Sequence, residues 1–249
     1  MRNIVAANWK MNMFFSDIDL FFSGLDSYYD SIDFSHKEVY IAPSFLYFSH
    51  VKEKVLNNRY NIRVGLQNCH YEDKGAFTGE VSPEMAKDVN ADFIIMGHSE
   101  RRHVFNESNE FINKKIIACL NKGIQAILCV GETLEQRNEN KTFSVLENQL
   151  IECLKNINDL EKLVIAYEPV WAIGTGKTAT EEQIEEVHTW LRKFLEKNIA
   201  NNIPLLYGGS VKPENIKNIM TIENVNGVLV GGASLNIEQF IKIINFDKE

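Results

Sequence analysis

Three side chains that can take part in proton transfer each follow a short apolar run: Lys10, His98 and Glu168. A carboxylate can act as a general base, an imidazole as a general acid, and an ammonium group can stabilise a developing oxyanion. Taken singly, a lone histidine is usually a packing or surface residue, and a glutamate before proline is usually a loop charge. If the fold brings all three to one rim, with Asn8 beside them, they form a set suited to acid–base catalysis.

Two glycine pairs follow the last two apolar runs of the chain, as Gly208-Gly209-Ser210 and Gly231-Gly232. A residue without Cβ lets backbone N–H groups approach an oxyanion, and a helix N-terminus adds a partial positive charge. A single glycine pair is typical of a turn. Two pairs at the ends of adjacent strands favour a phosphate site, so we expect a small phosphate ester as ligand.

The elements that must position these residues are short β-rich runs, continuous in apolar character as in parallel strands shielded on both faces. They are Ile4 to Ala7, Val39 to Ala42, Ile62 to Leu66, Phe93 to Met96, Ala126 to Val130, Leu163 to Tyr167, Pro204 to Tyr207 and Val228 to Val230.

Helix signals lie between these runs. Ser82 offers an N-cap before Pro83, and Thr180 begins a capping box. The stretch from Asn113 to Asn121 places Ile116, Ile117 and Leu120 on one face, and Gly123 follows as a C-terminal stop.

Eight β-then-α units in 249 residues favour a single (β/α)8 barrel of the α/β class, with an open doubly wound sheet as the alternative. No low-complexity linker divides the chain, so we expect one domain over residues 1–249. In such a barrel the carboxyl ends of the strands form the active face, which places the residues named above on one rim. The connection from Cys69 to Val81 is unusually long and indicates a functional or interface role.

The stretch from Gly174 to Thr178 resembles the end of a nucleotide-binding P-loop. That motif needs glycine five positions before its Gly-Lys pair, where this sequence has Trp171. The P-loop interpretation is therefore rejected. An apolar tip with glycines between stiffer ends predicts a lid from Pro169 to Lys177 that closes over substrate and excludes water.

Composition and charge limit the function classes. Hydrophobic residues make up 45% and charged residues 24% of the chain, which is typical of a folded globular protein. The net charge of -8 opposes binding to nucleic acid or to an anionic membrane. The four cysteines form no CxxC pair, and MRNIVAANWK lacks the long apolar stretch of a signal peptide. We therefore expect a cytoplasmic protein with reduced thiols.

A metal site is not expected. His98 and Glu100 repeat the His-x-Glu spacing of zinc deaminases, but the Pro-Cys-x-x-Cys segment that completes such a site is absent. His98 and His103 also lie outside any HExxH pattern.

Several motifs are specific enough to suggest a family: Ala7-Asn-Trp-Lys-Met-Asn12, Gly97-His-Ser-Glu-Arg-Arg102, Cys129-Val-Gly-Glu-Thr133, Ala166-Tyr-Glu-Pro-Val-Trp-Ala-Ile-Gly-Thr-Gly176, Tyr207-Gly-Gly-Ser210 and Val230-Gly-Gly-Ala-Ser234. Together they resemble the triosephosphate isomerase family from end to end. That resemblance implies the TIM barrel fold and an isomerase of glycolysis and gluconeogenesis. The family interconverts dihydroxyacetone phosphate and D-glyceraldehyde 3-phosphate without a cofactor or metal.

The resemblance also implies a role for each site residue. Glu168 is the base that moves a proton between C1 and C2, and His98 is the neutral electrophile that polarises the carbonyl. Lys10, beside Asn8, stabilises the developing enediolate. The substrate phosphate is held by Gly174 of the lid together with Ser210, Gly231 and Gly232.

Other matched positions concern assembly and support. The family is usually a homodimer in which the long loop, here His70 to Gly79, enters the rim of the partner. Gln67, Asn68 and Thr78 match interface positions, Glu100 matches a position that contacts the catalytic lysine, and Cys129 matches one behind the base. The sequence departs from the family at Asn106, where glycine is frequent, and at Asn226, where aspartate is frequent.

Two other functions remain open from the sequence. A phosphate-binding or scaffold protein that keeps the barrel needs the glycines but not Glu168. An aldolase acting on a phosphorylated sugar needs a lysine placed for Schiff-base chemistry, and Lys10 is the strongest candidate for that role.

Overall fold

The computed structural model describes residues 2–172 and 178–247. Its eight strands are all parallel, in the order β3-β2-β1-β8-β7-β6-β5-β4, and their boundaries lie close to the predicted ones. The strands are β1 Asn3–Asn8, β2 Lys37–Ala42, β3 Ile62–Val64, β4 Phe93–Met96, β5 Gln125–Val130, β6 Leu163–Tyr167, β7 Leu205–Tyr207 and β8 Gly227–Val230.

The sheet closes on itself between β3 and β4. Leu66, just beyond β3, forms a parallel bridge with Ile94, and its N–H donates to the Phe93 carbonyl at 2.9 Å. Gly65 permits this approach, because a Cβ there would lie 2.5 Å from the Phe93 oxygen. The closed barrel is therefore confirmed and the open-sheet alternative is excluded.

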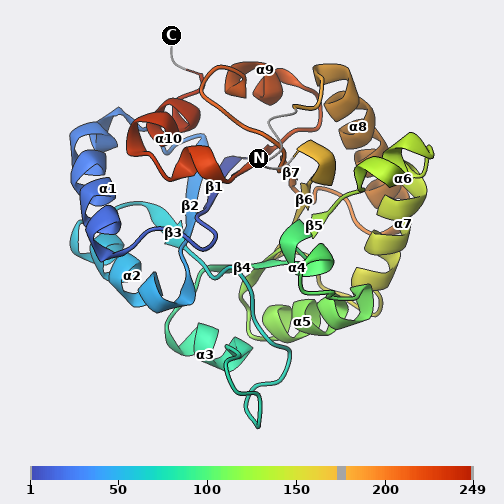
Figure 1. Cartoon of the computed structure of the whole chain (residues 1–249), viewed down its shortest axis with the longest axis horizontal. Coiled ribbons are helices and arrows are strands. Elements are labelled where there is room, and N and C mark those ends of the chain that lie inside the picture. Colours follow the sequence, from blue (N-terminus) through green and yellow to red (C-terminus); the bar gives the residue numbers. More distant parts are fainter. Residues whose placement is uncertain (1, 173–177, 248–249) are drawn as a thin grey trace.

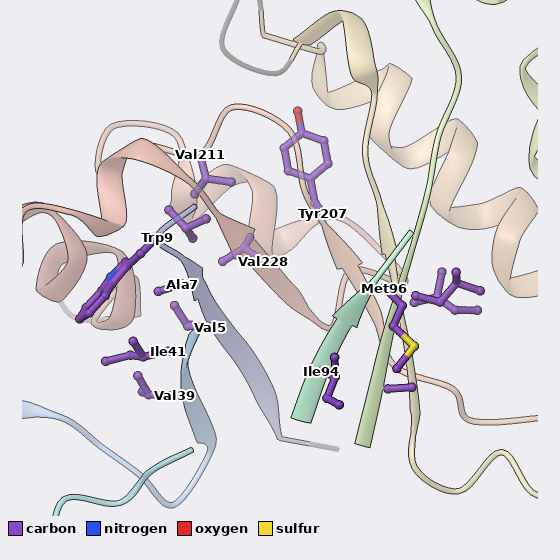
Figure 2. Close-up of a cluster of buried hydrophobic side chains, with 14 of the residues drawn as sticks. Val5, Ala7, Trp9, Val39, Ile41, Ile94, Met96, Tyr207, Val211 and Val228 are labelled. Atoms are coloured by element: carbon purple, nitrogen blue, oxygen red, sulfur yellow. The ribbon is translucent and has the colours of Figure 1, made fainter. Parts of the chain in front are cut away.

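Successive side chains of each strand point to opposite faces of the sheet, so the barrel has two hydrophobic cores. Ile4 and Ala6 of β1 point into the barrel, where they share a cluster with side chains such as Tyr40 and Phe93. Val5 and Ala7 instead belong to the larger cluster between the strands and the surrounding helices, part of which is drawn in Figure 2. The barrel is filled with side chains, so a ligand must bind at its rim.

Helices alternate with the strands and form a ring around them (Figure 1). They are α1 Phe15–Tyr28, α2 Phe48–Asn57, α3 Pro83–Asp88, α4 Ser99–His103, α5 Asn109–Asn121, α6 Leu134–Asn138, α7 Thr142–Cys153, α8 Glu181–Asn198, α9 Ile216–Thr221 and α10 Ile237–Ile244, with short 3-10 turns η1 Tyr29–Ser31, η2 Phe45–Tyr47, η3 Val170–Ala172 and η4 Gly232–Ser234. Among these described helices, none has the length and apolar composition needed to cross a membrane.

The predicted helix starts are confirmed. The Ser82 hydroxyl accepts the Met85 N–H at the start of α3, and Thr180 forms a capping box with Gln183 at the start of α8.

The prediction for α5 is confirmed for Ile116, which is buried, and for Leu120, which packs against the core, but the helix begins earlier and Ile117 is not part of the core cluster. The helix begins at Asn109, capped by Ser108, and buries Ile112, Lys115, Ile116 and Cys119, whereas Ile117 and Leu120 are only half-buried. Lys115 can lie on the inner face because its ammonium group pairs with Glu107 and Asn68. The predicted stop is confirmed, since Gly123 has φ of +74° just after the helix.

The long connection after β3 contains no helix and projects beyond the ring of helices beside α3 (Figure 1). At its base the His70 ring stacks on Tyr71, with ring centroids 4.4 Å apart. The centroid of the Phe77 ring lies 4.2 Å from that of His70. Phe111 of α5 packs against both His70 and Tyr71. The loop is thus anchored to the barrel by its own aromatic side chains.

Candidate active site

A cavity of about 930 Å³ opens at the carboxyl ends of the strands. Its lining includes every predicted site residue in the described part of the chain: Asn8, Lys10, His98, Glu168, Ser210, Gly231 and Gly232. Residues from β1, β4, β6, β7 and β8 or the loops after them therefore meet at one rim, as the barrel topology requires.

Glu168 lies directly beyond β6 and is 2% exposed. Its Oε2 accepts the Ser99 N–H at 2.9 Å, and its Oε1 lies 3.1 Å from Nε2 of His98. Gly208, beyond the neighbouring β7, leaves room for the side chain, because a Cβ there would lie 2.8 Å from Cγ of Glu168. The carboxylate is thus held in a largely water-free pocket against the imidazole.

His98 is the N-cap residue of α4. Its Nδ1 accepts the Glu100 N–H at 3.2 Å, so in the neutral ring the proton lies on Nε2, the nitrogen that faces Glu168. This geometry suits a neutral imidazole that donates a hydrogen bond into the cavity.

Lys10 has a left-handed backbone with φ of 53°, which is unusual for a residue other than glycine. Two side chains satisfy its backbone: Asn8 Oδ1 accepts its N–H at 3.0 Å, and Gln67 Nε2 donates to its carbonyl at 2.8 Å. The Lys10 Nζ lies 2.8 Å from Oε1 of Glu100. The lysine therefore presents a fixed cation at the cavity wall.

The glycines after β8 face this cation. A Cβ on Gly231 would lie 3.6 Å from Cε of Lys10, and a Cβ on Gly232 would meet no atom within 4 Å. The turn η4 that begins here is tied to β1, because Trp9 Nε1 donates to the Ser234 carbonyl at 3.1 Å. The space beside Gly232 and near Lys10 is therefore open to an anionic ligand.

Comparisons with known proteins agree with this geometry over the whole chain. The sequence model of the family described as triosephosphate isomerase matches residues 3–247. A triosephosphate isomerase from Thermodesulfovibrio yellowstonii is 47% identical over 98% of this chain and 99% of its own length. Relatives of the same name from Aquifex aeolicus and Finegoldia magna are 45% and 46% identical, each over 98% of this chain and over 99% and 98% of their own lengths.

The chain belongs to the triosephosphate isomerase family.

Two further positions at the rim, Glu100 and Cys129, match positions of the triosephosphate isomerase family. Glu100 contacts Lys10, as predicted from the family, and Cys129 is fully buried behind Glu168. Burial raises the pKa of the Cys129 thiol well above its ordinary value, so this side chain stays protonated and packs as an apolar group. Gly174 and most of the predicted 169–177 lid lie outside the described residues.

Sequence reasoning missed residues that support the triosephosphate isomerase site but do not line its cavity. Gly131, beyond β5, must be glycine, because a Cβ there would lie 1.8 Å from the Glu168 carbonyl oxygen. Gln149 of α7 binds both backbone groups of Gly131. Gly131 stands within the quoted motif from Cys129 to Thr133, but Gln149 is one amide in an ordinary helix and carries no sequence signal.

Proposed function

We propose that this chain interconverts dihydroxyacetone phosphate and D-glyceraldehyde 3-phosphate through an enediolate, in glycolysis and gluconeogenesis. The observation that carries the proposal is the meeting of Glu168 and His98, 3.1 Å apart, across a cavity that Lys10 also lines. Carboxylate, imidazole and ammonium then stand where one base, one hydrogen-bond donor and one cation are needed.

Glu168 is the base. It takes a proton from one carbon of the triose and returns it to the neighbouring carbon. Burial of the carboxylate supports this role, because water that is kept out of the pocket cannot compete with the substrate for the base. To reach a substrate carbon, the side chain must exchange its bonds with Ser99 and His98 for contact with the ligand.

His98 and Lys10 stabilise the charge that forms on oxygen. The Nε2 proton of His98 polarises the carbonyl, and the Lys10 ammonium group, beside Asn8, balances the enediolate. Donors and cations fixed before reaction act at no reorganisation cost, which makes such stabilisation a large part of catalysis. The pairing of Lys10 with Glu100 presents it as a cation, which favours this role over Schiff-base chemistry.

The phosphate is held by backbone groups of Gly231 and Gly232, by Ser210, and by Gly174 of the lid. The closeness of Gly231 to Lys10 supports this assignment. Closure of the 169–177 lid excludes water, which prevents loss of phosphate from the enediolate. The reaction requires neither a cofactor nor a metal, as in the rest of the family.

The molecule works as a homodimer in the cytoplasm, with a single domain over residues 1–249. The projecting loop from His70 to Gly79 enters the rim of the partner. Support for the dimer comes from that loop and from the apolar side chains Met11 and Leu46, which are 94% and 85% exposed. Support for the compartment comes from the four cysteines, which are all free and buried.

The direct test is a coupled assay of glyceraldehyde 3-phosphate turnover with wild type and Glu168→Gln. The variant keeps the shape of the side chain but removes the base, so kcat is expected to fall by about 10² to 10⁴. Competitive inhibition by inorganic phosphate should persist, because the anion-binding groups are unchanged.

Glu214→Gln is the matched control, since Glu214 also lines the cavity but contacts neither His98 nor Ser99. Its kcat is expected to stay within about twofold of wild type. Absence of turnover in the wild type would refute the function, and a Glu168→Gln variant within tenfold of wild type would refute the role of this residue.

A further inference from the structure

The carboxyl end of β5 extends beyond its neighbour β4. The ladder between these strands ends where Met96 pairs with Leu128, but β5 continues to Val130 and its backbone runs on past Gly131. In a parallel sheet both backbone groups of one residue face the same neighbour, and those of the next residue face the other. The last pair of this ladder uses the Cys129 N–H, and beyond it the Cys129 carbonyl and both backbone groups of Gly131 face the β4 side, where no strand continues.

Two side chains take the place of the missing strand. Arg102 Nη2 donates to the Cys129 carbonyl at 3.0 Å. The amide of Gln149 then binds both groups of Gly131: its Oε1 accepts the N–H at 2.8 Å, and its Nε2 donates to the carbonyl at 3.0 Å. Gln149 is 8% exposed, so both bonds are buried. The amide therefore completes the pairing of Gly131 as a strand would.

The opposite edge of the same segment carries Glu168. The Glu168 N–H donates to the Val130 carbonyl at 2.8 Å, and the Val170 N–H donates to the Glu132 carbonyl at 3.1 Å. Between these two bonds Gly131 touches the Glu168 backbone so closely that no Cβ fits. The backbone of the proposed base is thus seated on a three-residue segment whose other edge is held by Gln149.

We propose that Gln149 is a positioning residue for the isomerisation: it fixes Gly131, and Gly131 fixes the backbone from which Glu168 reaches the substrate. The inference rests on the proposed role of Glu168 as base. Gln149 itself is not among the described residues that line the cavity.

The Glu168 side of the site and the proposed phosphate-binding residues lie on different strands. An effect of Gln149 on catalysis can therefore be measured separately from an effect on substrate binding. Three of the four residues proposed to bind the phosphate, Ser210, Gly231 and Gly232, follow β7 and β8, whereas Gln149 acts on the segment after β5 and through it on Glu168. The fourth, Gly174, lies outside the described residues. A displaced Glu168 backbone therefore lowers the rate of proton transfer and leaves substrate affinity almost unchanged. A shift of about 1 Å in a catalytic group can cost up to about 10²-fold in rate.

The first experiment compares Gln149→Leu with wild type at a temperature well below the unfolding of either. Leucine removes both hydrogen bonds, so we expect kcat to fall at least about tenfold with KM within about twofold. The matched control is Asn113→Leu on α5, which also deletes an amide that bonds two positions, the Cys153 and Lys155 carbonyls, away from the cavity. That variant should lose stability but keep kcat.

Gln149→Glu provides a conservative variant. A protonated carboxyl group has one acceptor oxygen and one O–H donor, and can restore both bonds to Gly131, whereas a carboxylate repels the Gly131 carbonyl. The ratio of variant kcat to wild-type kcat is therefore expected to rise as the pH falls.

Amide hydrogen exchange tests the support of Gly131 by Gln149, here called the brace, independently of activity. In Gln149→Leu the Gly131 and Glu168 amides should exchange at least about tenfold faster than in wild type, whereas in Asn113→Leu they should not. A Gln149→Leu variant that keeps kcat, or loses no more than Asn113→Leu, would overturn the proposal. If Gln149→Leu does not fold, a flat pH ratio for Gln149→Glu overturns it instead. An inactive wild type would refute the proposed function, and faster exchange would still establish the brace.

Discussion

Lys10 keeps an unfavourable backbone conformation because two amides hold it there. A left-handed φ on a non-glycine residue costs about 1–3 kcal/mol, and such strain persists only where the surroundings fix it. Asn8 binds the Lys10 N–H, while Gln67 binds both the Lys10 and Ala42 carbonyls. The strain aims the ammonium group at the wall of the cavity, beside Gly231.

Replacing Lys10 by methionine should therefore weaken binding and turnover together. The change removes the cation but keeps the length of the side chain, and we expect KM to rise and kcat to fall, with a combined loss in kcat/KM of about 10²-fold or more. Steady-state kinetics with glyceraldehyde 3-phosphate measure both constants.

Lys242→Met is the comparison, because Lys242 also lines the cavity, whereas among the described residues it is Lys10 that pairs with Glu100 and lies beside Gly231. Its kinetic constants should stay within about twofold of wild type. Equal losses in the two variants would mean that general positive charge matters, not the placement of Lys10.

Single residues also show why the two family departures are tolerated. Asn106 has φ of 56°, a conformation that asparagine adopts more readily than other non-glycine residues, which explains how it replaces glycine. Asn226 Oδ1 accepts from the Leu205 N–H and from Arg192 Nη2, as a carboxylate oxygen can.

The chemical residues were predictable from the sequence because each follows a strand of a closed parallel barrel, where topology alone brings Lys10, His98 and Glu168 together. Gly131 and Gln149 were not, because their importance depends on a close approach of two backbones that no pattern in the sequence records. The role of Gly208 as space for the Glu168 side chain was missed for the same reason.

At the scale of elements, α8 is docked on the barrel through a buried histidine. His188 is fully buried, its Nδ1 lies 3.3 Å from the Asn224 carbonyl, and its ring packs edge-on against Tyr167 of β6. Its Nε2 has no hydrogen-bond partner in the described part of the chain. Burial lowers the pKa of His188 to about 4, and the charge of Arg192 adds to this effect.

The docking of α8 should therefore weaken in acid. Because the pKa is lowered in the folded state, the unfolded chain binds more protons between about pH 6.5 and pH 4. The contribution of His188 to the free energy of unfolding is complete above pH 6.5 and declines as the pH falls toward 4. At pH 5 the loss is about 2 kcal/mol.

Urea unfolding of wild type and His188→Gln at pH 7 and pH 5 measures this contribution. The wild type should lose about 2 kcal/mol more than the variant between the two pH values. An equal loss in both proteins would assign the acid sensitivity to other groups.

Element boundaries depended on how plainly the sequence separates apolar from polar residues. Strands were predicted closely because their apolar runs are continuous. The buried face of α5 was incompletely predicted because Lys115 breaks its apolar pattern, and only the pairing with Glu107 and Asn68 explains the burial of this lysine. Such pairing joins residues far apart in the sequence and cannot be inferred from helical periodicity.

At the scale of the whole molecule, the exposed apolar side chains predict self-association. Phe14 and Phe15 pack on Tyr47, with ring centroids 6.4 Å and 4.9 Å apart, yet the two phenylalanines remain 68% and 56% exposed. Sedimentation should give twice the chain mass of 28.6 kDa. Leu46→Glu places a charge beside this cluster and should shift the protein toward monomer.

Leu56→Glu serves as the control, since Leu56 is also exposed, at 64%, but lies near the end of α2. It should leave the dimer intact. A wild type that sediments at the mass of one chain would contradict the dimer, and equal effects of the two substitutions would place the contact elsewhere.

The bond between Trp9 and Ser234 joins positions 225 residues apart. It also ties the segment after the first strand, which carries Lys10, to the turn after the last strand, which is proposed to bind the phosphate. A chain still being synthesised therefore has no working site until almost all of it has left the ribosome.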